Sequence, residues 1–429
     1  MKHPDAPPVI SAHFSPTVRH GLRCHQPGYS PGVNEDGFSV SGLDETVERV
    51  ARQLAATAIE RDRRGGHARE ERERLRAAGL LTLSVPRAWG GEELPWSRIL
   101  KIIRRLAEAD SSLAHILGFH HLQVASVLCF GDEPQRERYL RGTVEKNWFW
   151  GNALSPLATE PDTRTEADGT LRLTATKRFC SGALGSDMLT VSLHRNGADR
   201  LRRHMAVVPT ARAGITVNDD WDNIGQRQTD SGTVRFDNVT IASDEVLAHA
   251  PSLDEVRGGL RNGISQLILA NLYLGIGFGA LAEGRRYTLE NSRSHLAPGV
   301  ESAGRDPYVL HRYGNLWIQL SAARALTDAV LARYDAAWAQ RDDLPEEEHH
   351  GLALAISEAK VFNARVGLEV AEQIFDAAGA RATASRFGLD RFWRNIRTHS
   401  LHDPIDYRLR DLGAWYLHGD WPVPPIRTA

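Results

Sequence analysis

The sequence predicts a protein of the α+β class in which a helical domain, a β domain and a helical bundle follow one another. Apolar residues recur at helical spacing from Asp44 onward and again, in longer stretches, after Pro251. Between Trp148 and Leu247 the pattern changes to short alternating runs separated by Gly and Asp, which is typical of strands joined by turns. A chain of 429 residues exceeds one ordinary hydrophobic core, so two or three packed units are expected.

Each predicted segment follows from its local pattern. The first is rich in Pro, Gly, Ser and His without periodicity, which predicts a flexible arm. The last carries two apolar stripes, beginning at Leu316 and Leu352, that predict helices of about 20 residues each, long enough for a four-helix bundle. The predicted segments are a flexible N-terminal arm over 1–40, an N-terminal helical domain over 41–145, a central β domain over 146–250 and a C-terminal helical bundle over 251–429.

Composition and charge argue against several classes of partner. Lys plus Arg number 52 and Asp plus Glu 54, a net charge of -2, so no strong field favours nucleic acid or an anionic membrane. The three cysteines, Cys24, Cys129 and Cys180, are widely spaced, which favours reduced thiols over a disulfide framework and offers no metal-binding cysteine cluster. The N-terminal residues lack the apolar run of a signal peptide, and we therefore expect a cytoplasmic protein. We also expect no resident metal.

One apolar segment, Leu267 to Ala282, has to be assigned either to a membrane or to the protein interior. Its 16 residues fall short of the roughly 20 that a spanning helix needs, and they include Asn271 and three glycines. A helix buried on all sides is therefore favoured. The glycines of Gly275–Gly279 lie inside this helix rather than between a strand and a helix, so they predict close helix packing and not a nicotinamide site.

The stretch from Arg397 to Tyr407 sets two imidazoles and a carboxylate close together near the C-terminus. His399 and His402 are three residues apart, so on one helical turn both rings would point to the same side. Imidazoles are groups that hold or transfer a proton near neutral pH. The same pattern also fits a helix terminus that is capped by His or Asp and stopped by Pro404, and the residues alone leave both interpretations open.

Five short motifs, in the same order along the chain, resemble characteristic motifs of the acyl-CoA dehydrogenase superfamily. The resemblance covers roughly residues 44–420. Within the superfamily the chain is most similar to flavin-dependent monooxygenases of the dibenzothiophene monooxygenase and sulfur-acquisition oxidoreductase type, chiefly through Thr229–Val234 and Thr398–Pro404. The motifs that carry the wider resemblance are Val85–Gly91, Lys177–Ala183, Gly225–Val239 and Gly275–Thr288.

The resemblance implies the oxygenase component of a two-component flavin monooxygenase. Such an enzyme takes reduced FMN, rather than FAD, from a separate NAD(P)H:flavin reductase, and free diffusion of the flavin can link the two. It then uses O2 to oxidise a small sulfur-containing or aromatic substrate through a C4a-(hydro)peroxyflavin. The resemblance further implies a homotetramer formed through the C-terminal helices, which also contribute to the flavin site.

The resemblance also assigns candidate site residues. His399 and His402 are the first candidates for hydrogen bonding to a flavin peroxide, with Ser181 and His115 as further catalytic candidates, although His115 could instead be a satisfied core histidine. Phe119 stands where related monooxygenases carry a Tyr, so one pocket hydroxyl is expected to be missing. The expected flavin contacts are Asn152, Ser155, Phe179, Ser181, Ser231, Arg293 and Arg381, with Arg293 reaching a phosphate across a subunit boundary and Ser231 and Arg381 also on the phosphate side. The expected substrate pocket contains His115, Phe119, Trp221 and Asp403.

Three other functions compete with this hypothesis. An FAD-dependent acyl-CoA dehydrogenase would need a carboxylate base, but Ser400–Asp403 stands where many such enzymes carry Glu-Gly-Thr, and Asp403 is a poor substitute. A non-catalytic flavin-binding paralogue is the second alternative. A di-iron bundle would need two Glu-x-x-His helices and two further Glu residues, and the matches Glu346–His349 and Glu347–His350 lie in an acidic segment expected to be a solvated loop.

Overall fold

The computed structural model describes residues 42–154, 163–194, 203–249, 255–293 and 300–421. The chain divides into two units, Met1–Glu45 and Thr46–Ala429, and the elements below belong to the second, apart from the first residues of α1 (Gly42–Arg64). The flexible arm expected over 1–40, together with Cys24 and Ser155, lies outside the described residues.

Helices make up most of residues 42–146. The Asp110 carboxylate caps α4 by accepting hydrogen bonds from the backbone N–H groups of Ser112 and Leu113, at 3.0 and 3.1 Å. α4 is buried on nearly all sides, although three His, three Ser and one Gln stand among its apolar residues. After α1 come α2 (Arg69–Ala77), η1 (Arg87–Trp89), α3 (Trp96–Ala109), α4 (Ser111–Phe130), α5 (Glu133–Arg136), η2 (Glu137–Arg141) and α6 (Gly142–Glu145).

The central segment folds into two sheets that share one apolar core. In the first sheet β4 pairs in parallel with β1 and antiparallel with β5, and in the second all neighbours are antiparallel in the order β2-β3-β7-β6. Leu173, Val191, Val208 and Phe236 are among the core residues. The strands are β1 (Trp150–Ala153), β2 (Thr163–Thr165), β3 (Leu171–Lys177), β4 (Met188–His194), β5 (Arg203–Pro209), β6 (Ile215–Val217) and β7 (Val234–Ile241), followed by η3 (Ser243–Glu245).

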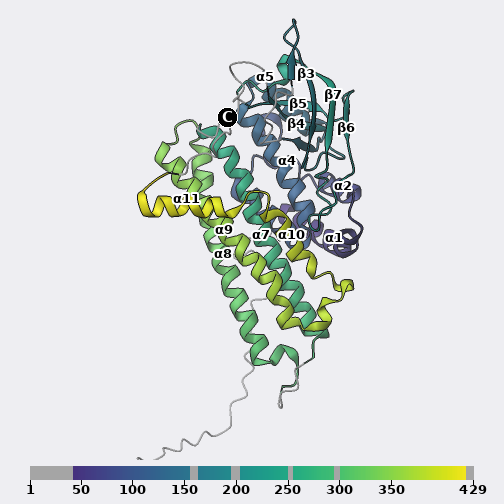
Figure 1. Cartoon of the computed structure of the whole chain (residues 1–429), viewed down its shortest axis with the longest axis vertical. Helices are drawn as coiled ribbons and strands as arrows, with labels where there is room; N and C mark the ends of the chain where they lie inside the picture. Colours follow the sequence, from purple (N-terminus) through teal and green to yellow (C-terminus); the bar gives the residue numbers. More distant parts are fainter. Residues whose placement is uncertain (1–41, 155–162, 195–202, 250–254, 294–299, 422–429) are drawn as a thin grey trace, which may run out of the picture. The chain divides into compact units, whose positions relative to one another are not determined.

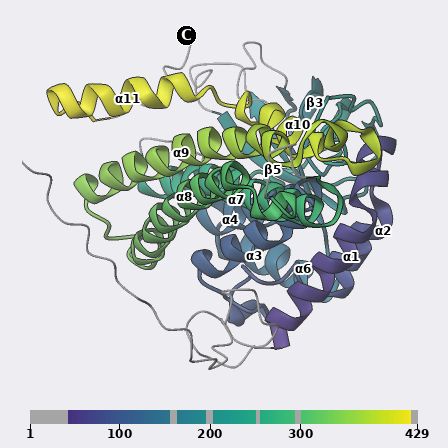
Figure 2. The ribbon, with the colours of Figure 1, turned by 90° about the horizontal axis from the view of Figure 1, so that it is seen from below.

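Long helices form the C-terminal part, and Figures 1 and 2 show α7, α8 and α9 running side by side. These three helices have 36, 33 and 33 residues, so the expected length of about 20 was too short. The apolar stripes mark only the buried middle of each helix, and polar residues continue the helix at both ends. The elements are α7 (Val256–Asn291), η4 (Ala303–Arg305), α8 (Pro307–Ala339), α9 (Glu346–Ala378), η5 (Ala380–Thr383), η6 (Ser385–Phe387), α10 (Asp390–Ser400) and α11 (Ile405–His418).

The glycines of α7 allow α3 to pack unusually close to it. A Cβ atom on Gly275 would lie 2.3 Å from the Arg104 carbonyl oxygen, and one on Gly279 would lie 2.3 Å from the Glu108 carbonyl oxygen. Real Cβ atoms do not approach backbone this closely, so these positions accept only glycine without a shift of the helices. The prediction that Gly275–Gly279 serves close helix packing is therefore confirmed.

Two described helices, α4 and α7, are long and apolar enough to cross a membrane. In each, however, 89% of the apolar window is buried inside the protein, which identifies both as interior helices. The expectation of a buried helix over Leu267–Ala282 agrees with this arrangement. One expectation about the C-terminal part was wrong: Glu346–His349 and Glu347–His350 lie in the first turns of α9 and not in a loop, because Pro345 precedes and starts that helix.

Candidate functional site

Three buried aromatic side chains from three helices meet in the interior. The ring of His115 on α4 lies 4.5 Å from the ring of His399 on α10, measured between centroids. Tyr273 on α7 approaches His399 edge-on at 6.4 Å, and Phe119 packs against His115 at 4.1 Å. The sequence pointed to His115, His399 and Phe119, and the structure brings them together. Tyr273 was not predicted.

Most polar atoms of these three buried rings lack a partner within the protein. Neither nitrogen of His115, nor Nδ1 of His399, nor the hydroxyl of Tyr273 makes a hydrogen bond among the described residues. Burial lowers the pKa of His115 well below its usual value, and burial together with His402 and Lys360 lowers the pKa of His399 to about 3. Both imidazoles are therefore neutral near pH 7, and each keeps one N–H group and one lone pair. Because buried polar groups in proteins normally find partners, this cluster is suited to a ligand.

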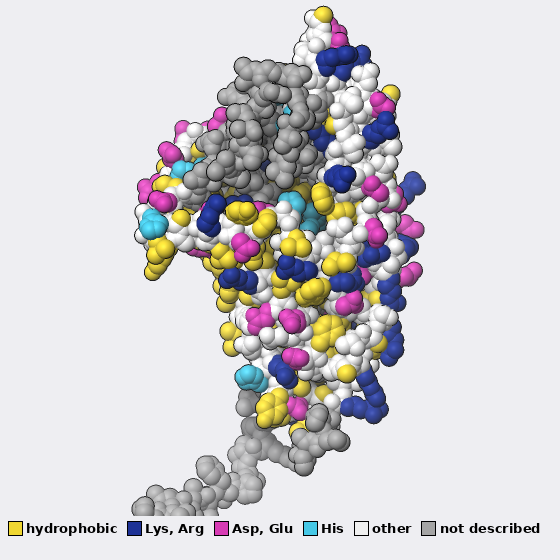
Figure 3. Space-filling view, in the orientation of Figure 1, with side chains coloured by type: hydrophobic (Ala, Val, Ile, Leu, Met, Phe, Trp, Pro, Cys, Tyr) yellow, Lys and Arg dark blue, Asp and Glu magenta, His cyan; other side chains and the backbone are white. Residues whose placement is uncertain are grey.

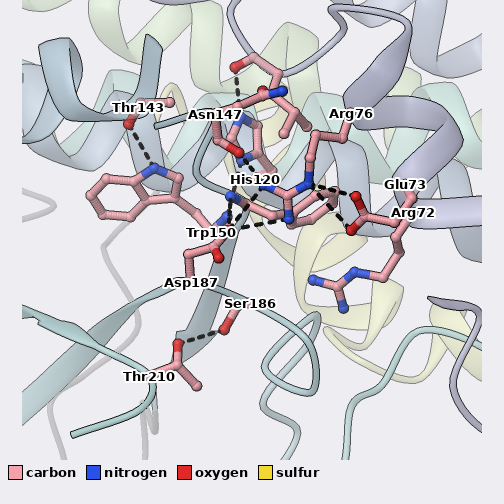
Figure 4. Close-up of polar contacts among 12 residues, drawn as sticks. Arg72, Glu73, Arg76, His120, Thr143, Asn147, Trp150, Ser186, Asp187 and Thr210 are labelled. Atoms are coloured by element: carbon pink, nitrogen blue, oxygen red, sulfur yellow. Dashed lines mark hydrogen bonds and ion pairs between the residues drawn. The ribbon is translucent and has the colours of Figure 1, made fainter. Parts of the chain in front are cut away.

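Two neighbouring histidines on α4 show what a structural role looks like. His120 Nδ1 accepts a hydrogen bond from the Trp150 backbone N–H at 3.1 Å, so its Nε2–H donates to the Leu81 carbonyl at 2.7 Å. The Trp150 indole in turn donates to the Thr143 hydroxyl at 2.9 Å, and Figure 4 shows both bonds of Trp150. His121 is likewise satisfied at both nitrogens. His120 attaches β1 to α4 and His121 attaches the 80–84 segment to α4, whereas His115 on the same helix has no such role.

A partly buried ion-pair network lies next to the histidine cluster. Asp403 accepts hydrogen bonds from Lys360 and from Arg408, each at 2.8 Å, and Lys360 also donates to Gln266 at 2.7 Å. Burial raises the pKa of Asp403, but the Lys360 and Arg408 cations outweigh this effect and bring it to about 2. A carboxylate that is so strongly stabilised by two cations is a weak base. Lys360 was missed from the sequence, although a single lysine within the apolar stripe of α9 was a usable signal.

His402 follows α10 in a turn, where its backbone N–H donates to the His399 carbonyl at 3.0 Å. In contrast to His399, the His402 residue is exposed. Surrounding protein atoms and the Lys360 ammonium nonetheless lower the pKa of its imidazole. His399 is thus part of the buried cluster, and His402 lies at its solvent side.

A second group of predicted residues surrounds a chain of hydroxyls. The Ser181 and Ser231 hydroxyl oxygens are 2.8 Å apart, and Ser231 is also 2.8 Å from the Thr229 hydroxyl. The Asn152 backbone N–H donates to the Ser181 carbonyl at 3.2 Å, which places the end of β1 beside this chain. Because Ser181 and Ser231 are in direct contact, the flavin contacts expected of their two hydroxyls would lie close together.

Phe179, two residues before Ser181, is held in a strained and exposed conformation. Its φ is 55°, a region that bulky residues rarely adopt, and its side chain is 64% exposed. The turn is fixed by hydrogen bonds from the Ser181 N–H to the Phe179 carbonyl at 3.0 Å and from the Cys180 N–H to the Gly232 carbonyl at 3.1 Å. The Phe179 ring meets Trp221 edge-on at 6.0 Å. An aromatic ring presented to solvent near the linked hydroxyls of Ser181, Ser231 and Thr229 suits a flat aromatic ligand, and these groups fit a flavin.

Arg72 connects the loop that carries Ser231 to the loop that carries Gly182 and Leu184. Its guanidinium forms a buried ion pair with Asp230 at 2.9 Å, donates to the Gly182 carbonyl at 3.1 Å and to the Leu184 carbonyl, and lies 4.2 Å above the Phe149 ring. Asp230 itself has a positive φ of 47°. The ion pair therefore holds a strained loop conformation in place.

Arg293 and Arg381 lie at the other end of the C-terminal helices. Both are exposed, and the Ser292 hydroxyl donates to the Ala378 carbonyl at 2.7 Å, which ties the two arginine-bearing segments together. Along α7 the rise from Tyr273 to Asn291 is about 27 Å, so Arg293 cannot touch the same mononucleotide as the His399 cluster of its own chain. Ser155 lies outside the described residues. The individual roles of the site residues stay predictions.

The fold and the motif order are those of the acyl-CoA dehydrogenases, and the chain belongs to that family. The acyl-CoA dehydrogenase N-terminal, middle and C-terminal domains match residues 42–147, 152–239 and 267–407. The predicted fold class and the predicted family are confirmed, and the chain falls in the monooxygenase branch. The domain boundaries given above remain predictions.

Among its relatives, the chain is 44% identical to the probable FMNH2-dependent monooxygenase SfnC of Pseudomonas putida, over 88% of this chain and 95% of the relative. The structure of the methanesulfinate monooxygenase MsuC from Pseudomonas fluorescens is similar with a TM-score of 0.85 and 42% identity, covering 90% of this chain and all of the other. The dibenzothiophene monooxygenase TdsC from Paenibacillus sp., solved with FMN and indole, has a TM-score of 0.85 and 37% identity, covering 90% and 99%. The predicted enzyme class, a flavin-dependent monooxygenase, is confirmed.

The Arg72 ion pair yields a first prediction. Arg72→Met leaves the buried Asp230 carboxylate with the His67 ring nitrogen, 2.9 Å away, in place of a guanidinium, and we expect the free energy of unfolding to fall by about 3 kcal/mol, with weaker FMN binding. Arg74→Met is the matched control, because Arg74 makes only an exposed contact with Glu70 at 3.9 Å, and about 1 kcal/mol or less should be lost. Urea denaturation measures both variants. Equal stability of the two would contradict the role given to Arg72.

Proposed function

We propose that the protein is the oxygenase component of a two-component monooxygenase that uses FMNH2 and O2 to oxidise a small sulfur-containing or aromatic molecule. The observation that carries the proposal is the neutral, largely unpartnered pair His115 and His399, which is buried against the rings of Phe119 and Tyr273. The similarity to FMN-dependent enzymes that oxidise sulfur compounds supports the choice of cofactor and substrate class.

In this proposal, reduced FMN supplies the two electrons that activate O2, so that one oxygen atom reaches the substrate and the other leaves as water. Asn152, Phe179, Ser181, Ser231 and Trp221 hold the flavin ring. Neutral His399 offers a hydrogen bond without placing a cation in the site, and the buried walls exclude water that would divert the reaction to hydrogen peroxide.

The dehydrogenase alternative is weakened by the state of Asp403. Removal of a carbon-bound proton needs a basic carboxylate that is free to reach carbon. Asp403 instead binds two cations and has a pKa of about 2. Its place in the substrate pocket stays a prediction, but a role as general base does not fit these contacts.

A reductase-coupled assay tests the oxygenase proposal. We expect the protein, supplied with FMN, NADH, a generic flavin reductase and a panel of sulfur and aromatic compounds, to form products that have gained one oxygen atom. Omission of the reductase should abolish product formation. Consumption of NADH with hydrogen peroxide as the sole oxidised product, across the panel, would contradict the proposal. Bleaching of bound FAD by an acyl-CoA without oxygen would instead support a dehydrogenase.

The two C-terminal histidines should differ in effect. His402→Ala should retain FMN affinity but release a larger share of the consumed O2 as hydrogen peroxide, because His402 closes the solvent side of the His399 cluster. The measurement is the ratio of product to NADH consumed in the coupled assay. An unchanged ratio would show that His402 has no part in protecting the reaction.

We propose further that the partner is a separate flavin reductase, that the enzyme works in the cytoplasm, and that four copies of the chain form its functional oligomer. The reduced state of the buried cysteines Cys129 and Cys180 supports the compartment. Hydrophobic side chains gather on the surface over the C-terminal helices (Figure 3), where α8 and α11 present exposed apolar residues. These residues are Leu310, Trp317, Ile318, Tyr416 and Leu417. Apolar surfaces of this kind favour contact with further copies.

Oligomer formation would also resolve the position of Arg293. Since Arg293 lies too far along α7 to serve the site of its own chain, a neighbouring copy has to supply it as the phosphate contact. A guanidinium can bind a phosphate through two hydrogen bonds, which makes this residue a strong contributor to FMN affinity.

Subunit complementation tests this arrangement. Arg293→Ala and His399→Ala chains should each be weakly active alone, but activity should reappear when both are co-expressed with different tags and purified as mixed oligomers, because some sites then carry neither change. Mixed oligomers of His115→Ala and His399→Ala are the matched control, since both residues serve one chain's site. Failure of the Arg293 mixture to recover activity beyond this control would contradict the shared site.

A further inference from the structure

Tyr273 is a buried hydroxyl with no structural task. It lies in the middle of α7, its side chain is fully buried, and its oxygen makes no hydrogen bond among the described residues. An unsatisfied buried hydroxyl is unfavourable for folding, and a phenylalanine of nearly the same shape would avoid the loss. Folding stability therefore does not explain why this position carries a hydroxyl, and a role in binding does.

Other buried or half-buried tyrosines of the chain show the usual arrangement. The Tyr334 hydroxyl donates to the Leu260 carbonyl at 2.8 Å, the Tyr139 hydroxyl to the Val207 carbonyl at 3.3 Å, and the Tyr313 hydroxyl bonds to Thr288 at 2.8 Å. Each of these bonds connects two elements of the fold. Tyr273 differs from them, although it lies in the same bundle as Tyr334.

The position of Tyr273 connects it to the histidine cluster. Its ring contacts His399 edge-on at 6.4 Å, and the His399 ring in turn packs at a tilt against the His115 ring. The charged groups nearby are already engaged, since Lys360 binds Asp403 and Gln266. Burial and the Asp403 charge raise the pKa of Tyr273, so the phenol stays protonated and acts as an O–H donor. Tyr273, His115 and His399 thus carry up to three neutral donors that have no partner among the described residues.

We propose that Tyr273 contacts the substrate and donates a hydrogen bond to an oxygen atom that the substrate already carries on sulfur. This proposal rests on the oxygenase function and narrows its substrate class to sulfoxides and sulfinates, in preference to sulfides and thiophenes. In the reaction a new bond forms between sulfur and one atom of O2. The other atom leaves as water, with both electrons and both hydrogens taken from FMNH2. Tyr273 orients the existing oxygen and is not consumed.

Two variants that each remove one hydroxyl test the proposal. In the reductase-coupled assay, the probes are methanesulfinate and two matched pairs, thioanisole with methyl phenyl sulfoxide and dibenzothiophene with its sulfoxide. Tyr273→Phe should lower kcat/KM about 10-fold for probes that carry oxygen on sulfur, because one hydrogen bond is lost. The kcat/KM for the unoxidised member of each pair should stay nearly unchanged. Tyr334→Phe is the matched control and should not alter this preference.

Thermal stability separates a binding role from a structural one. Tyr273→Phe should have an unchanged or higher Tm, because no protein hydrogen bond is lost, whereas Tyr334→Phe should have a lower Tm. A lowered Tm for Tyr273→Phe, or an equal effect on both members of each pair, would overturn the assignment while leaving the oxygenase function intact. A wild-type enzyme that oxidises no sulfur or aromatic compound would overturn the proposed function itself, and the Tyr273 proposal with it.

Discussion

The buried ion pair between Arg72 and Asp230 is the interaction on which the flavin side of the site depends. One guanidinium binds a carboxylate on the loop before β7, two carbonyls on the loop after β3 and the face of Phe149. These two loops carry the hydroxyls of Ser231 and Ser181, which touch one another at 2.8 Å. A cation with planar, directional donors can join several segments at once, and a lysine would not reproduce this set of contacts. The strained backbone at Asp230 persists because the pair determines its position.

The opposite side of the site follows from the close packing of helices. Gly275 and Gly279 let α3 lie against α7, and the side chains of His115 and His399 are buried in the interior. Burial then decides the chemistry, because it keeps both imidazoles neutral at pH 7. Neighbouring Lys360 keeps Asp403 ionised and occupied, so the cluster contains hydrogen-bond donors and acceptors but no free base. Such a site favours oxygen transfer over proton abstraction from carbon.

Much of this could be predicted from the sequence, because the signals are local. The change from helical spacing to alternation and back marks the three structural parts, and short motifs indicated His115 and His399, whose rings the structure brings together. Tyr273 and Lys360 were not predicted as site residues. Each is a single polar residue within an apolar helical pattern, and such a residue is also compatible with ordinary helix packing. The contact between Ser181 and Ser231 depends on two loops distant in sequence, and the separation of Arg293 from His399 depends on the true length of α7. None of these relations is encoded in a local pattern.

The most direct test of the central claim is the fate of the oxygen atoms. With dioxygen labelled by a heavy isotope, in unlabelled water and with FMN, NADH and a flavin reductase, mass spectrometry of the product gives the origin of the new oxygen. The neutral, water-excluding site described here predicts one labelled atom in each product molecule and the other in water. Product oxygen derived from the solvent, or label recovered only in hydrogen peroxide, would contradict it.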